Sequence, residues 1–140
     1  MNLQELLVDN MKHFSDHRGD LLPVEFSDLP FLPQRMFITI QSGSFDGEKR
    51  VRGKHANKTC QQYFYCITGE VDISLFDGKE KHHFSLRAGQ GLFVDKMIWN
   101  QYLNKSPIGH SCVYVVLASH PYDGSDYITN IDEFMKITSV

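Results

Sequence analysis

The residue types that could do chemistry are concentrated in segment 52–61, RGKHANKTCQ. His55 and Asn57 share one face of an extended strand, because side chains alternate with a period of two, and Gln61 follows four residues later. One imidazole with two carboxamides is a poor site for zinc, iron or manganese. We therefore expect no bound metal and no other cofactor. The alternative is that His55 is a hydrogen-bonded polar residue lining a barrel.

Short strands are the elements that must position these residues. Stretches rich in β-branched and aromatic residues predict strands at 21–26, 35–40, 62–68, 71–76, 81–86, 92–94, 99–103 and 112–118, with one short helix at 131–137. Asp77-Gly78 is the strongest hairpin signal and predicts a type I′ turn. Because crossover helices are missing from this pattern, we expect an all-β fold, best matched by a double-sheet jelly roll.

Length and composition exclude several classes of protein. The 140 residues are enough for one domain with its own core, so 1–140 is expected to be a single domain. A net charge of −3 argues against general nucleic-acid binding. The chain has no apolar run long enough to span a membrane, and its first residues lack the apolar region of a signal peptide. Three cysteines without a CxxC pair indicate reduced thiols, so we expect a cytoplasmic protein without a membrane partner.

The order of several stretches resembles one known family. His55, Asn57 and Gln61 look like a degenerate cupin motif, in which two histidines and a glutamate would hold a metal. The whole chain resembles the sugar-nucleotide 3,4-ketoisomerases, WxcM-like cupins that convert dTDP-4-keto-6-deoxyglucose to its 3-keto isomer. The matching stretches are DHRGDL (16–21), RMFI (35–38), RGKHANK (52–58), CITGEV (66–71), GLFV (91–94) with Trp99, VLAS (116–119), YD (122–123) and DYI (126–128).

This resemblance implies a cupin-type jelly roll, a homodimer, metal-independent chemistry and a dTDP-linked 4-keto-6-deoxy sugar as ligand. In the family pattern RGxHAH, two histidines are implicated as an acid–base pair. This chain keeps the first as His55 and has Asn57 in place of the second. Gln61 stands where the family commonly has a glutamate, and Asn100 stands after Trp99 where a histidine is common.

The implied reaction defines what the site must supply. Moving a carbonyl from C4 to C3 requires removal of the C3 proton, an enediol, and delivery of a proton to C4. Histidine, with an ordinary pKa of about 6.5, suits this work, so His55 is expected to be the general acid and base. Asn57 and Gln61 are expected to polarise substrate oxygens, because a carboxamide hydrogen-bonds but does not titrate. His17 is the next candidate for a second proton carrier.

Three arginines are candidates for holding the diphosphate. Arg18, Arg35 and Arg52 lie in the matching stretches, and guanidinium groups bind phosphate oxygens bidentately. Trp99 and Asn100 complete the predicted substrate-binding set.

Two functions remain open at this stage. The first is an isomerase that makes a deoxysugar for a surface glycan, favoured by Arg18, Arg52 and His55. The second is a non-catalytic nucleotide-sugar-binding cupin, favoured by Asn57. A metal cupin is disfavoured by the ligand count.

Overall fold

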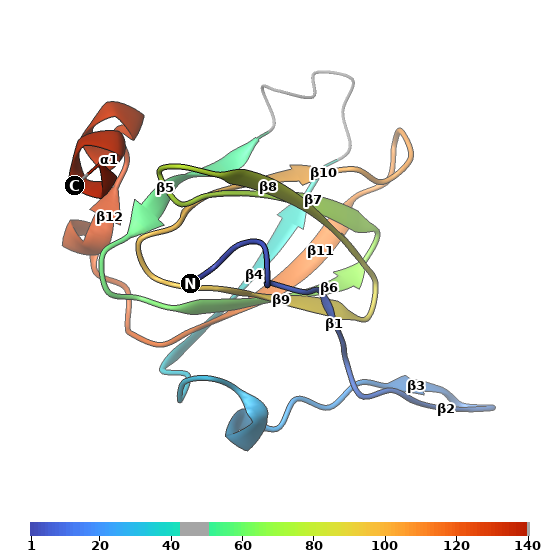
Figure 1. Cartoon of the computed structure of the whole chain (residues 1–140). Helices are drawn as coiled ribbons and strands as arrows, with labels where there is room; N and C mark the ends of the chain where they lie inside the picture. The colour runs from blue at the N-terminus through green and yellow to red at the C-terminus, as the bar shows by residue number, and fades with distance from the viewer. Residues whose placement is uncertain (43–50, 140) are drawn as a thin grey trace.

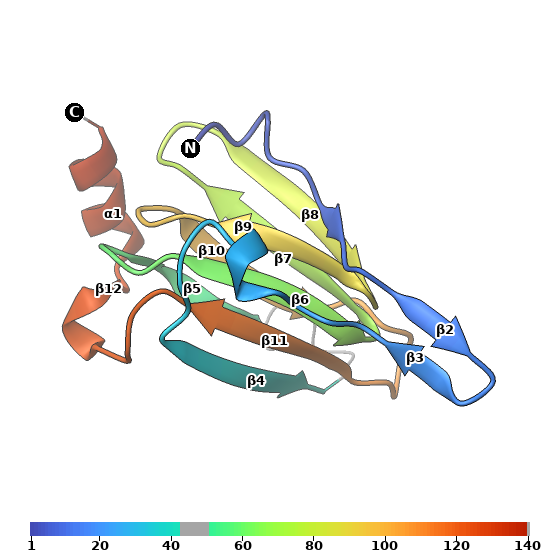
Figure 2. The same ribbon diagram turned by 90° about the horizontal axis from the view of Figure 1, so that it is seen from below.

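Two five-stranded antiparallel sheets packed face to face form the body of the protein in this computed structural model, which describes residues 1–42 and 51–139 (Figures 1 and 2). The first sheet has the order β1 (Asp9–Asn10), β9 (Gln90–Val94), β6 (Gln62–Thr68), β11 (Cys112–Ala118) and β4 (Arg35–Gln41). The second has the order β12 (Tyr127–Ile128), β5 (Arg52–Asn57), β10 (Trp99–Asn104), β7 (Glu70–Phe76) and β8 (Lys81–Arg87).

A short hairpin, two 3₁₀ turns and one helix lie outside these sheets in the described part of the chain. Strands β2 (Phe14–Asp16) and β3 (Gly19–Leu21) form a hairpin that projects away from the body (Figure 2). Single 3₁₀ turns occur at Phe26–Asp28 and Gly124–Asp126. Helix α1 (Ile131–Thr138) begins after Asn130, whose side-chain oxygen accepts hydrogen bonds from the amides of Asp132 and Glu133 and so caps the helix.

Apolar side chains are buried on both faces of the sheets. The main core lies between the sheets and includes Phe64, Ile73 and Val116. Residues on the outer face of the first sheet, such as Tyr63 and Tyr65, are covered by the chain between β1 and β4. On the outer face of the second sheet, Ala56, Trp99 and Ile128 pack against Phe134 of α1.

The expected fold class is confirmed: the described residues are mostly strand, with one short C-terminal α-helix. The strands predicted at 62–68 and 112–118 occur with those boundaries. The strand predicted at 21–26 is wrong, because β3 ends at Leu21 and a 3₁₀ turn begins at Phe26. Pro23 lies between them and has no N–H to donate to a strand ladder.

The hairpin at Asp77-Gly78 exists, but its turn differs from the predicted type I′. Of the two residues only Gly78 has a positive φ, 101°, whereas a type I′ turn needs positive φ at both. The connection between β7 and β8 has four residues, because the Asp77 carboxylate accepts hydrogen bonds from the amides of Lys79 and Glu80, both at 2.8 Å. Among the described residues, no helix is long and apolar enough to cross a membrane.

Candidate active site

Strand β5 presents His55 and Asn57 to the space between the sheets. Ala56, between them, is fully buried on the opposite face in the cluster around Phe134. Because side chains alternate along a strand, His55 and Asn57 must then point inward. The two residues expected to share a face do so, and that face is the inner one.

A β-bulge at the start of β5 sets the direction of His55. Asn100 on β10 pairs with His55, and the next residue, Gln101, pairs with Gly53, so Lys54 is the extra residue. Gly53 and Lys54 both have positive φ, 86° and 55°. A Cβ on Gly53 would lie 2.8 Å from the Asn100 carbonyl oxygen and from the Tyr102 ring, so only glycine fits there. Bulges of this kind re-aim side chains beside functional sites.

The imidazole of His55 has a free nitrogen inside the protein. Its Nε2 is buried and has no hydrogen-bond partner among the described residues. The hydrogen bond between His55 and the Gly53 backbone therefore involves Nδ1, which leaves the lone pair of the neutral ring on Nε2. Burial lowers the pKa of His55, against the opposing effects of Gly53 and the Asn57 side chain. Near neutral pH the imidazole is thus held in its basic, uncharged form.

Asp126 orients the side chain of Asn57. The Asn57 Nδ2 atom donates a hydrogen bond to Asp126 Oδ2 at 3.2 Å, so the amide oxygen points the other way, toward the interior. Burial opposes ionisation of Asp126, but hydrogen bonds from Thr59, the Cys60 amide and Asn57 outweigh it and lower the pKa of Asp126. The carboxylate stays charged and Asn57 presents an acceptor.

Asn100 lies opposite His55 and is almost fully buried, with 1 % of its surface exposed. Its Oδ1 accepts a hydrogen bond from the Tyr102 hydroxyl, and its Nδ2 donates to the Ile98 carbonyl at 2.9 Å. Tyr114 lies beside Tyr102, with ring centroids 5.9 Å apart. The interior next to His55 is therefore lined by amides and phenols.

Gln62, and not the predicted Gln61, points into the space between the sheets. Gln61 precedes β6, and its Nε2 donates to Asp95 at 2.9 Å. Gln62 is the first residue of β6, is 4 % exposed, and has an Oε1 without a hydrogen-bond partner in the described part of the chain. Gln62, Phe64 and Cys66 share the inner face. Because side chains alternate along a strand, Gln62 could have been predicted if the inner face of β6 had been known.

The three arginines occupy different places. Arg35, on β4, lies over the rings of Phe37 and Tyr122, at 4.8 and 5.2 Å from their centroids. Arg52, at the start of β5, is close enough to Tyr114 to lower the pKa of that phenol, which burial raises to about 12. Arg18 lies in the β2–β3 hairpin, paired with Asp16 at 2.6 Å and largely exposed. Arg35 and Arg52 thus lie near the interior site of this chain, and Arg18 does not.

Trp99 and His17 also lie apart from His55. Trp99 is on the outer face of β10, where it packs against Phe134 at 5.8 Å and donates to Gln101 at 2.9 Å. His17 is at the tip of the hairpin that points away from the two sheets (Figures 1 and 2).

A cavity of about 290 Å³ opens at the end of the sheets where β5 meets β12. It is close to the lower end of the ~300–1,000 Å³ range of ligand pockets, which suits a sugar ring better than a whole nucleotide sugar. Its polar lining side chains include Arg35, Asn57, Gln62, His120, Asp126 and Tyr127. The Nδ1 atom of His120 lies 2.7 Å from the Ser119 hydroxyl. His55 is not itself a lining residue but is adjacent to two of them: it lies two residues from Asn57 on β5, and its ring centroid is 4.8 Å from that of Tyr127, edge-on at 81°.

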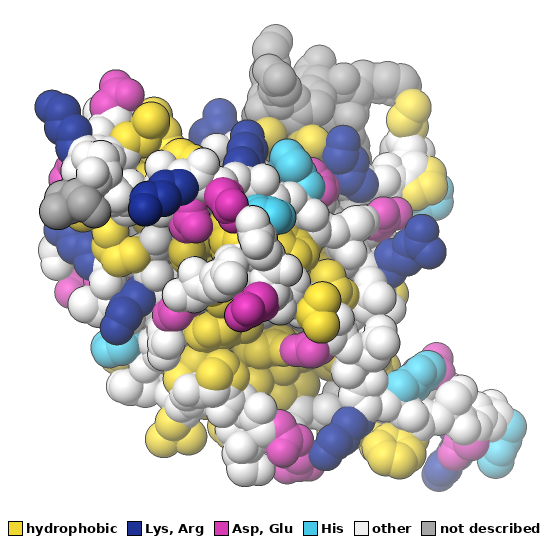
Figure 3. Space-filling model, viewed as in Figure 1, with side chains coloured by type: hydrophobic (Ala, Val, Ile, Leu, Met, Phe, Trp, Pro, Cys, Tyr) yellow, Lys and Arg dark blue, Asp and Glu magenta, His cyan; other side chains and the backbone are white. Residues whose placement is uncertain are grey.

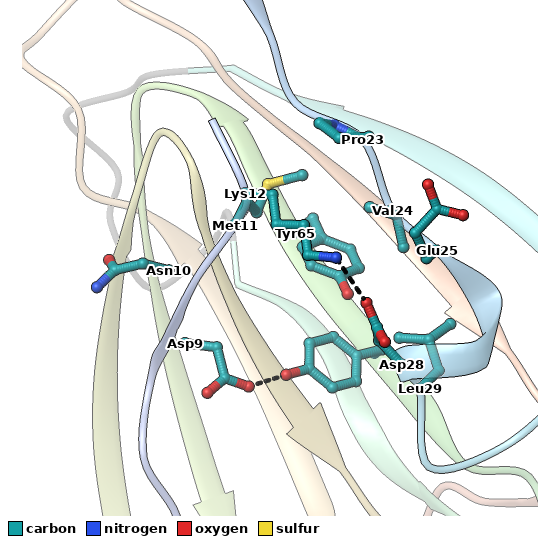
Figure 4. A pocket seen from close by; sticks show the side chains of 11 residues that line it. Asp9, Asn10, Met11, Lys12, Pro23, Val24, Glu25, Asp28, Leu29 and Tyr65 are labelled. Carbon is teal, nitrogen blue, oxygen red and sulfur yellow. Dashed lines mark hydrogen bonds and ion pairs between the residues drawn. The ribbon is translucent and has the colours of Figure 1, made fainter. Parts of the chain in front are cut away.

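A second cavity, of about 210 Å³, lies on the outer face of the first sheet (Figure 4). Tyr63 and Tyr65 line it; Tyr63 donates a hydrogen bond to Asp9, and Lys12 pairs with Asp28 at 3.2 Å. On this face of the molecule apolar side chains gather next to β9, with acidic side chains around them (Figure 3). Because it contains no imidazole and none of the predicted site residues, this cavity is not the candidate site.

A metal centre finds no support in the described ranges. Within 1–42 and 51–139, no group of three or more His, Cys, Asp or Glu side chains is arranged to hold an ion. The polar groups around His55 are instead carboxamides and phenols, which hydrogen-bond a ligand rather than ligate a transition metal.

Comparisons with known proteins match nearly the whole chain. The family model described as FdtA, WxcM-like, C-terminal, matches residues 4–139. The TDP-4-oxo-6-deoxy-alpha-D-glucose-3,4-oxoisomerase of Aneurinibacillus thermoaerophilus is 34% identical over 131 residues, 92% of this chain and 89% of that protein.

Solved structures that are similar to this chain include sugar 3,4-ketoisomerases. The sugar 3,4-ketoisomerase QdtA from Thermoanaerobacterium thermosaccharolyticum, in complex with TDP, superposes with a TM-score of 0.84 at 28% identity, covering 99% of this chain and 97% of that one. A histidine-to-asparagine mutant of QdtA, in complex with TDP-4-keto-6-deoxyglucose, has a TM-score of 0.84 at 27% identity, covering 99% and 96%.

Proposed function

The chain belongs to the WxcM-like family of sugar 3,4-ketoisomerases, and on this premise we propose that it moves the keto group of a dTDP-linked 4-keto-6-deoxyhexose from C4 to C3. The product would serve deoxysugar synthesis, as the names of its relatives indicate. The observation that carries the proposal is the buried, unpartnered Nε2 of His55 at the inner end of the cavity, as far as the described residues extend.

His55 is the base in this proposal. Its neutral ring takes the C3 proton at Nε2, and the resulting imidazolium, which exchanges its proton with solvent, delivers a proton to C4. The sugar lies at the inner end of the cavity, where Asn57 and Gln62 offer amide oxygens to its hydroxyl groups. Arg35 and Arg52 hold the diphosphate by charge-assisted hydrogen bonds. The proton moves between adjacent carbons through an enediol, so the reaction needs no oxidant or reductant.

Incubation with dTDP-4-keto-6-deoxyglucose in D₂O tests this function. We expect formation of the 3-keto isomer, detected by NMR, with solvent deuterium at the ring carbon that receives the proton, and a rate unchanged by a chelator. A protein that binds the sugar nucleotide but yields neither product nor deuterium at C3 or C4 would be a binding protein and not an isomerase.

Non-catalytic binding of a nucleotide sugar is the second candidate. Asn57, Gln62 and Asn100 line the inner face with amides, none of which can carry a proton. A histidine-to-asparagine mutant of the relative QdtA is described in complex with TDP-4-keto-6-deoxyglucose, so that relative still binds the sugar without one histidine. The isomerase remains the better proposal, because His55 keeps a free basic nitrogen beside the cavity.

A homodimer is part of the proposal. Strand β4 is an edge of the first sheet, and its outward side chains Met36, Ile38 and Ile40 are 60%, 57% and 71% exposed. A long apolar edge strand invites pairing with another chain. Three buried, unpaired cysteines suit the reducing cytoplasm, where we propose that the enzyme acts.

Light scattering tests the assembly. We expect twice the mass of one chain at micromolar concentration, and a monomer for Ile38→Lys, because a charge on the edge strand opposes pairing. Ile108→Lys, at an isoleucine 65% exposed between β10 and β11, is the matched control and should stay dimeric. A monomeric wild-type protein would contradict the dimer.

A further inference from the structure

Ketoisomerisation needs two kinds of proton transfer, and His55 accounts for only one of them. A proton must leave C3 and arrive at C4, which a single imidazole can do. A second proton must arrive at O4, and the proton of the C3 hydroxyl must leave O3. The second group has to lie beside His55 and reach the cavity.

Most neighbours of His55 cannot fill this role. Asn57, Gln62 and Asn100 carry carboxamides, which do not exchange protons at ordinary pH. The hydroxyl of Tyr102 already donates to Asn100. Asp126 is a carboxylate held in its charged form by Thr59, Cys60 and Asn57, so it has no proton to give.

Tyr127 meets both requirements. It lies on β12, directly opposite Asn57 on β5, and its ring contacts that of His55 edge-on, with centroids 4.8 Å apart. It also lines the cavity together with Asn57 and Gln62. Among the described residues it is the only tyrosine that does both.

The side chain of Tyr127 lies on the inner face of the second sheet. Ile128 and Ala56 form the neighbouring pair of the β5–β12 ladder and are buried together against Phe134 on the outer face. Because side chains alternate along a strand, Tyr127 and its partner Asn57 then face inward. The ring of Tyr127 thus lies on the same face as His55, which it contacts.

We propose that Tyr127 is a further catalytic residue, whose hydroxyl exchanges protons with the sugar oxygens while His55 exchanges them with the sugar carbons. This inference rests on the proposed ketoisomerase function. His55 Nε2 takes the proton from C3; the C–H electron pair becomes the C3=C4 double bond, and the C4 carbonyl π pair moves to O4. In a separate, later step the enediolate O4 takes the Tyr127 proton, so exchange at C3 does not require the phenol.

The second half of the reaction reverses these roles. The tyrosinate takes the proton of the C3 hydroxyl, the O3 electron pair forms the C3=O double bond, and the C3=C4 pair takes the proton from His55 at C4. Both residues return to their starting states, and no oxidant, reductant or metal is required. One imidazole serves adjacent carbons and one phenol serves adjacent oxygens.

Tyr127→Phe tests this division, because it removes only the hydroxyl and keeps the ring that packs on His55. In D₂O, NMR of recovered dTDP-4-keto-6-deoxyglucose measures exchange at C3, and NMR of the 3-keto product measures isomerisation. We expect isomerisation to fall by about 10²-fold, the lower end of the effect of losing a proton-transfer group. Exchange at C3 should fall much less, so that the ratio of exchange to isomerisation rises at least tenfold. Tyr65→Phe, on the outer face of β6, is the control and should match the wild type.

Each alternative outcome has a distinct meaning. Isomerisation within twofold of wild type in Tyr127→Phe would overturn the proposal. An equal loss of exchange and isomerisation would also overturn it, because Tyr127 would then act only by positioning His55. Unchanged dTDP affinity verifies that the variant is folded. If the wild-type protein shows neither exchange nor product, the ketoisomerase function itself fails, and the role of Tyr127 fails with it.

Discussion

His55→Asn should abolish both isomerisation and deuterium exchange at C3, lowering each by about 10⁴-fold or more, the upper end of the range for a general acid–base group. The buried Nε2 of His55 has no hydrogen-bond partner among the described residues, whereas His120, which also lines the cavity, has its Nδ1 2.7 Å from the Ser119 hydroxyl. Asparagine keeps a polar side chain at the position but cannot carry a proton. The affinity for dTDP should stay within about twofold, because the diphosphate is expected to be held by arginines elsewhere.

The pH dependence of the wild-type rate follows from the same nitrogen. The base is the neutral imidazole, and burial lowers the pKa of His55 from its ordinary 6.5, although the Gly53 backbone and Asn57 oppose this shift. The rate should therefore rise with pH through a midpoint below 6.5 and be level from there to neutral pH. The initial rate of product formation, measured at a series of pH values between 5 and 8, gives this midpoint.

His82→Asn is the matched control for His55→Asn. His82 lies on β8, paired with Leu75 and away from the cavity, and its loss should leave the rate unchanged. Full turnover by His55→Asn would show that the base lies elsewhere and would refute the mechanism.

Asn57→His should raise the rate of isomerisation by about 10²-fold, the lower end of the range for one added proton-transfer group. The new imidazole would lie on the same inward face as His55, because both are on β5. It would also meet Asp126, whose Oδ2 is 3.2 Å from the present Asn57 Nδ2. A carboxylate beside an imidazole favours its protonated form, which suits a group that gives a proton to an oxygen.

The increase should be larger in a Tyr127→Phe background than in the wild type, because the added histidine would then replace the missing carrier. Steady-state rates of the four proteins in this cycle measure the coupling between positions 57 and 127. Asn57→Leu has a similar volume and no proton to exchange, so it should not raise the rate. If Asn57→His did not raise the rate above that of its parent protein, either the wild type or Tyr127→Phe, a role for a proton carrier at this position would be contradicted.

The sequence by itself determined most of the longer strands and placed His55 and Asn57 on one face of one strand. Alternation placed His55 and Asn57 on one face, and the strands at 62–68 and 112–118 were predicted with their observed ends. The stretches shared with the ketoisomerases predicted the family that the comparisons support. These features are local, since they depend on residue types and spacing within a few positions.

Which face of a strand is inside was decided only by the tertiary structure. On β6, Tyr63 and Tyr65 are buried on the outer face while Phe64 and Cys66 are buried on the inner one. Apolar residues therefore occupy both faces of the strand, and their pattern does not indicate which face is inside. Gln61 and Gln62 could not be distinguished for that reason. The same holds on β10, where Trp99 packs outward under α1 and Asn100 points inward.

Tyr127 and Asp126 reach His55 and Asn57 only because β12 pairs with β5, some 70 residues earlier in the chain. Nothing in the local sequence specifies that pairing, since β12 has only two residues and follows a 3₁₀ turn. It is stabilised by packing of Ile128 and Ala56 against Phe134 and by hydrogen bonds to the Asp126 carboxylate. These are long-range contacts that form when the chain folds, so the partners of His55 were decided by the tertiary structure.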